Sequence, residues 1–491
     1  MKKLLTLLMV LATMSMVLAA CVQNGDAQQG THETGSDTQE AVQLDKLPAD
    51  LKFDGQDVVI LSRGVQKYTQ DEIAVPELTS DPVNDAVFNR NIVIGDRLGV
   101  HIVSKPLEDT DPFKTVAEIE RVVKAGSTDY DMFAGACYVT IASALRGTFC
   151  NLRELEYLDL SQDYWMQDYN DTISYGDKQY TATGMIALST YRLAMVTLYN
   201  KELFDDRSIP YLYDAIENNE WTLDYHAALV ENFYQDLNGN ATHDEEDLYG
   251  FVSSATINVD AYWSACDVAL VEKDADQAYK WVLNTQRLSD SVDKLLKLCY
   301  ESGGTYLCKE VGGTAQPGIR EMFAEGRAAT TTLRLLAVEL DEIRSMQDQY
   351  GIVPMPKFDA AQKEYGTQMH DQFTVFAIPA SAEASKLEMI GAVMEAMASE
   401  NLRMVKPAYY EIALKRKYMS DPIAWDMLDM AFVNVVVDAG VIYADTLEYP
   451  HHHLRTMIAN KSNTVASQYG KAASKMNKQL IKIVDKLEKL E

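Results

Sequence analysis

The alternation of strands and helices that opens the globular body is the feature that most constrains the fold. Residues 57–62, 100–104 and 130–135 are short apolar runs typical of buried strands. Between them, residues 81–98 and 113–125 carry apolar positions at helical spacing. This order predicts βαβ units around a largely parallel sheet, in which ligands bind beyond the carboxyl ends of the strands.

The remaining sequence keeps this mixed character. We predict further strands at 193–199, 328–336, 350–354 and 373–378, and helices at 221–235, 290–301 and 317–325. A closing amphipathic helix is marked by Tyr469, Met476, Leu480, Ile483 and Leu487. Because the body from residue 51 to residue 491 is too long for one ordinary domain, we expect two α/β lobes.

The first fifty residues carry an export signal. Lys2 and Lys3 precede an apolar run that ends in Ala19-Ala20-Cys21, which is typical of a secretory signal peptide over residues 1–20. The stretch LAAC also resembles the bacterial lipobox, in which the cysteine is acylated; the alternative is an ordinary signal peptide with a chance cysteine. Residues 21–50 are polar and are predicted to form a flexible tether. We therefore expect a protein held at the extracellular face of the membrane by lipid on Cys21.

Composition excludes several classes of partner. The formal net charge of −29 argues against nucleic acid and against anionic lipid head groups. No later apolar run reaches transmembrane length, so membrane contact is expected through the lipid anchor only. The five cysteines besides Cys21 show no CxxC spacing, which indicates buried thiols rather than a zinc site or a disulfide framework. No cofactor is required by any motif.

One acidic loop, residues 236–247, has the spacing of a calcium site. Oxygen-bearing groups at loop positions one, three, five, seven and twelve are Asp236, Asn238, Asn240, the carbonyl of Thr242, and Asp247. The loop departs from the EF-hand pattern because Ala241 stands at the glycine position and Asp247 at the glutamate position. A structural Ca²⁺ is one hypothesis, and a solvated acidic turn is the other.

Five segments, in this order, resemble the family 1 extracellular solute-binding proteins of ABC importers, the group that includes maltose-binding protein. They are VTLYNKELF (196–204), WTLDYHAALVENF (221–233), MFAEGRAATTTLR (322–334), YGIVPMPKFD (350–359) and VFAIPASAEASKLEMIGAVMEAMAS (375–399). The resemblance implies a periplasmic-binding-protein-like fold, with two α/β lobes joined by a hinge of crossing segments and a ligand cleft between them. It places residues 51–196 and 328–375 in the first lobe, and 197–327 and 376–491 in the second. The crossings are expected near 193–199, 325–331 and 373–378.

The same resemblance implies a function. Hinge closure would trap a sugar or oligosaccharide, which the protein, expected to be a monomer, would deliver to the permease subunits in the membrane. Sugar sites combine aromatic platforms with a few polar partners. The expected contacts are Trp263, Tyr138, Arg334, Tyr191, Arg63, Asp371 and Phe373. For each of them, core packing or surface exposure is the alternative.

Other chemistries find less support. The run His451-His452-His453 could bind a metal, but a polar loop is the preferred interpretation. The sequence contains no GxSxG, P-loop, HExxH or GxGxxG motif. A lipid-anchored glycoside hydrolase, an inert adhesin, and a carrier of peptides, polyols or polyamines remain as alternatives. A carrier leaves its ligand unchanged, whereas a hydrolase releases product.

Overall fold

The computed structural model describes residues 44–283, 285–410 and 422–490. The predicted signal peptide, Cys21 and most of the tether lie outside these residues. Residues 44–491 form one contact unit. None of the helices within the described ranges combines the length and the apolar character needed to cross a bilayer.

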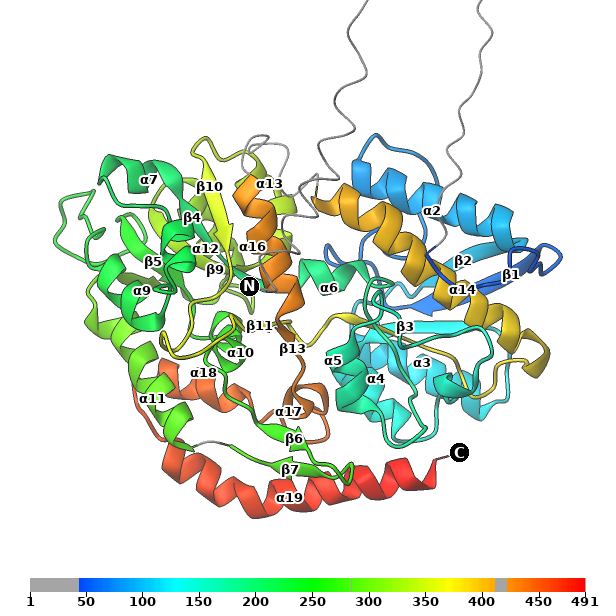
Figure 1. Ribbon diagram of the computed structural model, residues 1–491. Coiled ribbons are helices and arrows are strands. Elements are labelled where there is room, and N and C mark those ends of the chain that lie inside the picture. Colours follow the sequence, from blue (N-terminus) through cyan, green and yellow to red (C-terminus); the bar gives the residue numbers. More distant parts are fainter. Residues whose placement is uncertain (1–43, 284, 411–421, 491) are drawn as a thin grey trace, which may run out of the picture. The chain divides into compact units, whose positions relative to one another are not determined.

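The first sheet has the strand order β12-β3-β1-β2 (Figure 1). Its strands are β1 (Gln56–Ser62), β2 (Val100–Pro106), β3 (Met132–Ala136) and β12 (Thr374–Ala377). The first three are parallel, and β12 runs antiparallel to β3. Helices α2 (Pro82–Leu98) and α3 (Pro112–Lys124) connect the parallel strands. The predicted βαβ alternation is therefore confirmed element by element.

The caps of α2 show how the sequence sets these boundaries. Asp81 accepts hydrogen bonds from the backbone N–H groups of Val83 and Asn84 at 3.0 and 3.2 Å, which satisfies donors that a helix start leaves free. Pro82 occupies the first turn, where no backbone donor is needed. At the other end, Gly99 has a φ of 64°, the left-handed conformation that ends a helix at low cost. The next residue then starts β2.

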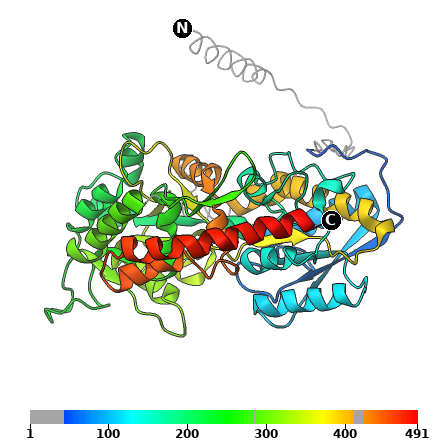
Figure 2. The same ribbon diagram turned by 90° about the horizontal axis from the view of Figure 1, so that it is seen from below.

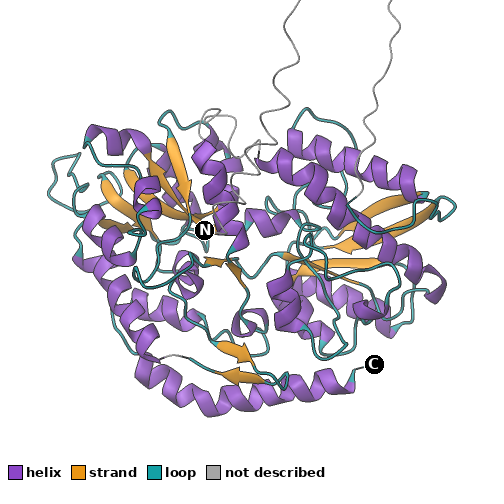
Figure 3. Ribbon diagram, in the orientation of Figure 1, coloured by secondary structure: helices purple, strands orange, loops and turns teal. Residues whose placement is uncertain are grey.

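The second sheet has the order β10-β4-β9-β5-β8. Its strands are β4 (Met195–Asn200), β5 (Tyr249–Ser253), β8 (Thr305–Leu307), β9 (Ala328–Arg334) and β10 (Tyr350–Val353). Strands β5, β8 and β9 are parallel, whereas β4 is antiparallel to both β9 and β10. Each sheet is flanked by helices (Figure 3).

This topology corrects the expected division of the chain. The resemblance places residues 328–375 in the first lobe, but β9 and β10 pair with β4 in the second sheet. The expected crossing at 325–331 does not occur, because α12, which precedes β9, already packs on β9 and β5 of the same sheet. The chain passes to the second sheet just before β4 and returns at β12. This return lies at the predicted segment 373–378. There the chain passes from the second lobe to the first, whereas the expected division had it pass from the first lobe to the second.

The remaining helices and short strands follow in chain order. Up to β9 they are α4 (Cys137–Ala144), η1 (Leu152–Glu154), α5 (Gln167–Ile173), α6 (Leu188–Arg192), α7 (Lys201–Asp206), α8 (Leu212–Glu217), α9 (Leu223–Val230), η2 (Ile257–Asp260), α10 (Ala261–Ala265), β6 (Val271–Lys273), β7 (Tyr279–Trp281), α11 (Thr285–Leu296), η3 (Lys297–Glu301) and α12 (Gln316–Ala324). After β9 they are η4 (Leu335–Glu339), α13 (Asp341–Arg344), β11 (Thr367–Gln368), η5 (Ala384–Lys386), α14 (Leu387–Glu400), η6 (Asn401–Val405), α16 (Pro422–Val433), β13 (Val435–Val436), α17 (Ala439–Ile442), α18 (His452–Ala459) and α19 (Val465–Lys489).

The C-terminal third does not belong to one lobe. Helix α14 packs against α2 of the first sheet, whereas α16 packs against β10 of the second. The long closing helix α19 lies along β7 and α11 (Figures 1 and 2). Its last turn also reaches first-lobe residues, since Lys178 donates a hydrogen bond to the carbonyl of Glu488 at 3.2 Å. The expectation that residues 376–491 all join the second lobe is therefore wrong for α14.

Candidate functional site

The strand ends of both sheets converge on one short segment, residues 369–374, that precedes and opens β12. On the side of the first sheet, the N–H of Cys137, which opens α4 after β3, donates to the carbonyl of Phe373 at 3.0 Å. On the side of the second sheet, the N–H of His370 donates to the carbonyl of Leu193, which precedes β4, at 3.0 Å. Because β4 is antiparallel to β9, this end of β4 lies beside the carboxyl end of β9. Residues that follow the parallel strands therefore meet at this segment, which is where α/β sheets bind ligands.

Arg63 directly follows β1 and is 2% exposed. Its Nη2 donates to the carbonyl of Gln372 and to Oγ1 of Thr374, the latter at 3.2 Å. Its guanidinium lies 5.0 Å from the ring centroid of Tyr68, and the Tyr68 hydroxyl donates to Oε1 of Gln372 at 2.5 Å. Its Nε and Nη1 find no acceptor among the described residues. Burial lowers the Arg63 pKa, although the guanidinium stays charged at neutral pH.

A second charged pair approaches the same segment from the other side. Arg455 in α18 forms a bidentate ion pair with Asp260. Its Nε donates to Oδ1 at 2.8 Å and its Nη2 donates to Oδ2. Next to this pair, Oδ1 of Asp371 is 3.4 Å from Nε2 of His370. Burial raises the pKa of Asp371 to about 7, and the negative charge of Asp260 adds to the rise, while Arg455 and Arg63 oppose it. A carboxyl group that is partly protonated at neutral pH can both donate and accept hydrogen bonds, which suits hydroxyl ligands.

The metal hypothesis for the histidine run meets a specific obstacle here. Asp260, His451 and His452 offer ligand atoms within 4.8 Å of one another. Burial lowers the pKa of His451 to about 3 and of His452 to about 4, so both rings are neutral. However, Arg455 binds both carboxylate oxygens of Asp260, and its positive charge would repel a cation. The polar loop expected at 451–453 is also wrong, because α18 begins at His452.

Tyr449 is a candidate contact that sequence reasoning missed. Its ring stacks on that of His452, with centroids 5.1 Å apart and planes at 19°, and meets the Tyr138 ring edge-on at 6.2 Å. Phe113, whose side chain is exposed, extends this aromatic row at 5.9 Å from Tyr138. Tyr449 has a φ of 55° and Glu448 a φ of 61°. Two successive left-handed residues with bulky side chains are uncommon and strained, a feature that clusters at functional sites.

The structure brings together six of the seven predicted contacts, all except Tyr191. Arg63, Tyr138, Arg334 and Asp371 act electrostatically on a shared set of neighbours: Tyr68 lies beside Arg63 and feels the charges of Arg334 and Asp371, and Tyr138 feels those of Asp371 and Arg63. Burial raises the pKa of Tyr138, and Asp371 raises it further.

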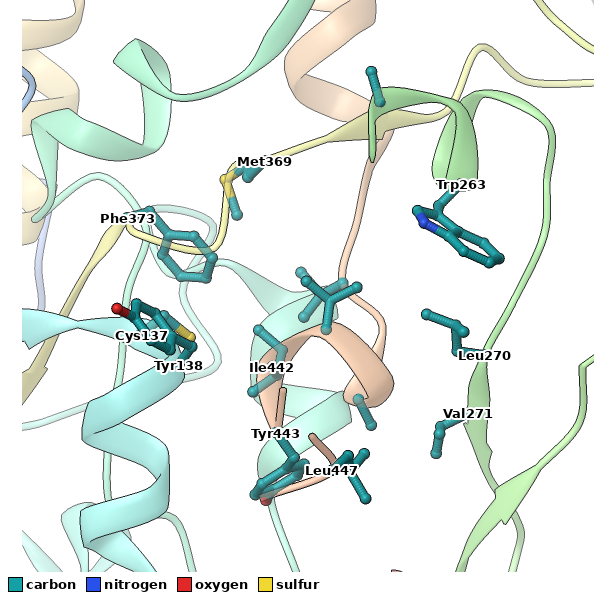
Figure 4. Close-up of a cluster of buried hydrophobic side chains, with 14 of the residues drawn as sticks. Cys137, Tyr138, Trp263, Leu270, Val271, Met369, Phe373, Ile442, Tyr443 and Leu447 are labelled. Carbon is teal, nitrogen blue, oxygen red and sulfur yellow. The ribbon is translucent and has the colours of Figure 1, made fainter. Parts of the chain in front are cut away.

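Trp263 and Phe373 lie at the same segment and are buried, whereas Tyr191 is buried elsewhere. Trp263 donates from Nε1 to the carbonyl of His451 at 3.3 Å, and it borders a cavity that Asp371 also lines. The Phe373 ring packs edge-on against Tyr169 at 6.0 Å, within a hydrophobic cluster that also contains Trp263 (Figure 4). Tyr191 lies away from the candidate site around residues 369–374, and its ring centroid is 4.8 Å from that of Phe432. Its ring lines a separate cavity of about 460 Å³ with Tyr164, Trp165 and Asp429.

The cavity at the candidate site around residues 369–374, which we call the cluster from here on, is small. It measures about 10 Å³ and is lined by Asp260, Trp263, His370, Asp371 and His451, among others. Such a volume holds about one water molecule, whereas small-molecule sites measure about 300–1,000 Å³. A sugar therefore requires the segments that line this cavity to separate.

The acidic loop has a backbone that matches its calcium hypothesis in part. The Asp236 carboxylate accepts hydrogen bonds from the N–H groups of Gly239 and Ala241 at 2.7 and 2.9 Å, which folds the loop back on itself. Ala241 takes the left-handed φ of 59° that the missing glycine would supply. Asp247 is fully buried at the end of the loop, with its carboxylate 3.2 Å from the Tyr234 hydroxyl. The candidate ligand atoms are all oxygens, the type that Ca²⁺ prefers, although those of Asp236 and Asn240 also accept backbone N–H groups of the loop.

Comparison with known proteins identifies the fold. Neither a protein-family model nor a curated protein matches the sequence. Among solved structures, an ABC transporter solute-binding protein from Thermotoga lettingae, bound with α-D-tagatose, superposes with a TM-score of 0.55 at 14% identity, covering 87% of this chain and 100% of its own. An ABC substrate-binding protein from Listeria monocytogenes, in complex with cycloalternan, gives 0.54 at 13% identity, with coverage of 87% and 99%. A solute-binding protein from Agrobacterium radiobacter, in complex with ribitol, gives 0.52 at 16% identity, with coverage of 87% and 99%. The chain therefore has the two-lobed α/β fold of these solute-binding proteins.

Proposed function

We propose that this protein is the substrate-binding component of an ABC importer and that it carries a sugar or a closely related polyol. The observation that carries the proposal is the cluster around residues 369–374, where residues that follow strands of both sheets meet. Aromatic rings and hydrogen-bonding groups stand next to one another there, as a sugar with apolar faces and hydroxyl edges requires. The ligands of the structurally similar proteins, a ketohexose, a cyclic oligosaccharide and a pentitol, are of this class.

Binding would proceed by opening and closing at the chain crossings. The cavity of about 10 Å³ is too small for a sugar ring, so the open form has to be populated before the ligand enters. A buried network supports one of the crossings: the Glu72 carboxylate accepts from the N–H and Oγ of Ser189 at 2.9 and 2.6 Å and from Oγ1 of Thr374 at 2.7 Å. Movement would then be concentrated at the ends of β4 and β12, which flank this network.

The remaining parts of the proposal concern location and partners. Acylation of Cys21 would hold the protein at the extracellular face of the membrane, and the closed, loaded form would be the one that docks on the permease. The acidic loop 236–247 would bind a structural Ca²⁺ through Asp236, Asn238, Asn240, the carbonyl of Thr242, and Asp247. No step of solute binding depends on that ion.

A hydrolase is the second candidate, because two carboxyl groups, Asp260 and Asp371, share the cluster. Asp371, with its raised pKa of about 7, would suit a general acid. Asp260 does not suit the second role, since Arg455 occupies both of its oxygens. A glycosidase nucleophile or base needs a free oxygen that faces the substrate. The carrier function is therefore the better supported one.

Thermal unfolding of the chain without residues 1–21, measured against a panel of sugars and polyols, tests the proposal. A ligand present at a hundred times its dissociation constant adds about 2.7 kcal/mol to the free energy of unfolding, which is a clear rise in the midpoint. We expect at least one sugar or polyol to raise the midpoint and to be recovered unchanged. Recovery of a cleaved sugar would establish the hydrolase instead. A flat response to the whole panel would contradict a sugar carrier.

A further inference from the structure

The charges around the candidate site are unusual for so acidic a chain. Three arginines, Arg63, Arg334 and Arg455, all act on the His370 ring, whose pKa they and burial hold well below its usual value. Against them stand Asp260 and Asp371. Asp260 is fully engaged by Arg455, and Asp371 is partly protonated at neutral pH, since its pKa is raised to about 7. Glu72 also attracts Arg63, so three carboxylates face the three arginines. Because Asp371 is only partly ionised, the positive charges are slightly in excess here, in a protein of net charge −29.

Two of these guanidinium groups have donors to spare. Nε and Nη1 of Arg63 are buried without an acceptor in the described part of the chain. Glu72 attracts Arg63 electrostatically, but its carboxylate is bonded to Ser189 and Thr374. A buried donor without a partner destabilises the folded state, and more strongly when it is charged.

Arg334 is the clearer case. It is the last residue of β9, opposite Met195 of β4, and it is only partly exposed. Its guanidinium has no hydrogen bond or ion pair with any described residue, and its charged neighbour Arg320 repels it while being paired with Glu342 at 2.9 Å. Burial lowers the pKa of Arg334, and the charge of Arg320 lowers it further, while Tyr68 raises it. Proteins keep buried charges paired, so an unpaired arginine at a ligand site points to a missing anion.

We propose that the solute is an anionic sugar, whose carboxylate or phosphate group is bound by Arg334 with the spare donors of Arg63 within the same site. This inference rests on the proposed carrier function and narrows its substrate class. The sugar ring would lie against the aromatic row of Tyr138 and Tyr449, while its charged group would face the end of β9. The planar fork of a guanidinium matches both carboxylate and phosphate oxygens.

The net charge of the protein does not prevent this. Within the described ranges most of the acidic side chains are exposed or half-buried. At physiological ionic strength the field of exposed charges decays over about 8 Å. Partly buried arginines are screened far less, so the local attraction outweighs the distant repulsion. The surface charge would slow the association of an anionic sugar rather than set its affinity.

Sugars matched in every respect except the charged group test the inference. Calorimetric titration of the chain without residues 1–21 would compare D-glucose with D-glucuronate and D-glucose 6-phosphate, and D-galactose with D-galacturonate, at pH 7.5. We expect an anionic member of a set to bind at least tenfold more tightly than its neutral parent. The uronate and phosphate arms distinguish the two sources of negative charge. Neutral sugars that bind equally well or better would overturn the inference and leave the carrier function standing. Failure of every charged and neutral sugar to bind would count against both.

A charge-matched pair of variants locates the effect. Arg334→Gln removes the unpaired guanidinium, whereas Arg121→Gln makes the same chemical change at an exposed pair with Glu118 on α3. We expect Arg334→Gln to reduce the ratio of the affinity for the anionic sugar to that for its neutral parent by at least tenfold. Arg121→Gln should keep the wild-type preference. An unchanged preference in Arg334→Gln would overturn the role of this residue.

Discussion

At the scale of single residues, the backbone of Tyr449 is the most informative feature. A residue other than glycine pays about 1–2 kcal/mol to adopt the left-handed conformation, and Tyr449 and Glu448 both do so. This strained backbone places the Tyr449 ring between the rings of Tyr138 and His452. We interpret this strain as the means by which the chain presents a flat ring to the solute.

Replacing Tyr449 separates its two roles. We expect Tyr449→Ala to weaken sugar binding by about 10- to 100-fold, because a ring that covers a sugar contributes roughly 1.5–3 kcal/mol. Tyr449→Gly should weaken binding equally but unfold at a higher temperature than Tyr449→Ala, since glycine adopts a positive φ without strain. Calorimetric titration and thermal unfolding provide the two readouts. Equal midpoints for the two variants would contradict the strain, and an unaltered affinity would contradict the contact.

Asp371 gives a second prediction, on pH. Its folded pKa of about 7 lies above the value of an unfolded aspartate, about 3.9, so the folded state binds the proton more tightly. The contribution of Asp371 to stability is therefore greatest below pH 4, falls as the pH rises towards 7, and is constant above that. Asp371→Asn mimics the protonated form. We expect its stability relative to the wild type to rise between pH 4 and pH 7, by at most about 4 kcal/mol.

Comparison with the wild type isolates this effect. The groups that face Asp371, namely Asp260, Arg455, Arg63, Tyr138 and His370, are present in both proteins and largely cancel in the difference. Denaturant unfolding at pH 5 and pH 8 measures it directly. A difference between variant and wild type that is the same at both pH values would show that Asp371 titrates normally.

At the scale of elements, the acidic loop 236–247 has its own test. We expect Ca²⁺ to raise the unfolding midpoint of the wild type, because binding to the folded state alone stabilises it. Asn240→Ala removes one oxygen ligand and should abolish that rise. Mg²⁺, which demands tighter octahedral geometry, should have little effect. Asp276→Ala, which removes an exposed acidic group from the turn between β6 and β7, should respond to Ca²⁺ as the wild type does. No response of the wild type to Ca²⁺ would leave the loop a solvated turn.

Helix α19 shows how much of an element can be predicted from spacing alone. The five apolar positions that marked it, from Tyr469 to Leu487, are all buried. We expect Leu480→Ala, at a position with no exposed surface, to lower the free energy of unfolding by about 2–5 kcal/mol. Its neighbour Ile481 is 59% exposed, so Ile481→Ala should change it by less than about 0.5 kcal/mol. Similar losses in the two variants, measured by denaturant unfolding, would mean that α19 does not pack as described.

Other elements were less predictable for a physical reason. The apolar spacing of residues 221–235 predicted one helix, but α9 covers only Leu223–Val230. The turn that follows packs against other backbone: a Cβ on Gly304 would lie 1.9 Å from the carbonyl oxygen of Val230. Such a tertiary contact leaves no trace in local periodicity. The start of α18 within the histidine run is a comparable case.

At the scale of the whole molecule, the sequence led to the correct fold class but to the wrong path between the lobes. The strand at 328–334 was correctly predicted as an element, yet its partner strands could not be, because burial on both faces makes strands of either sheet read alike. The candidate site was likewise predictable only in part. Arg63 and Tyr138 could be placed because they follow parallel strands, whereas Tyr449, Asp260 and Arg455 reach the cluster from segments far away in sequence.

A crystal structure of the complex with the sugar that raises the unfolding midpoint most is the most direct test of the account. We expect one intact sugar molecule at the cluster, in contact with Asp371, with Tyr449, and with Arg334 at the end of β9. The segments around residues 369–374 should enclose it from both sheets. A sugar bound instead in the cavity beside Tyr191 and Phe432, or a cleaved sugar at the cluster, would contradict the account.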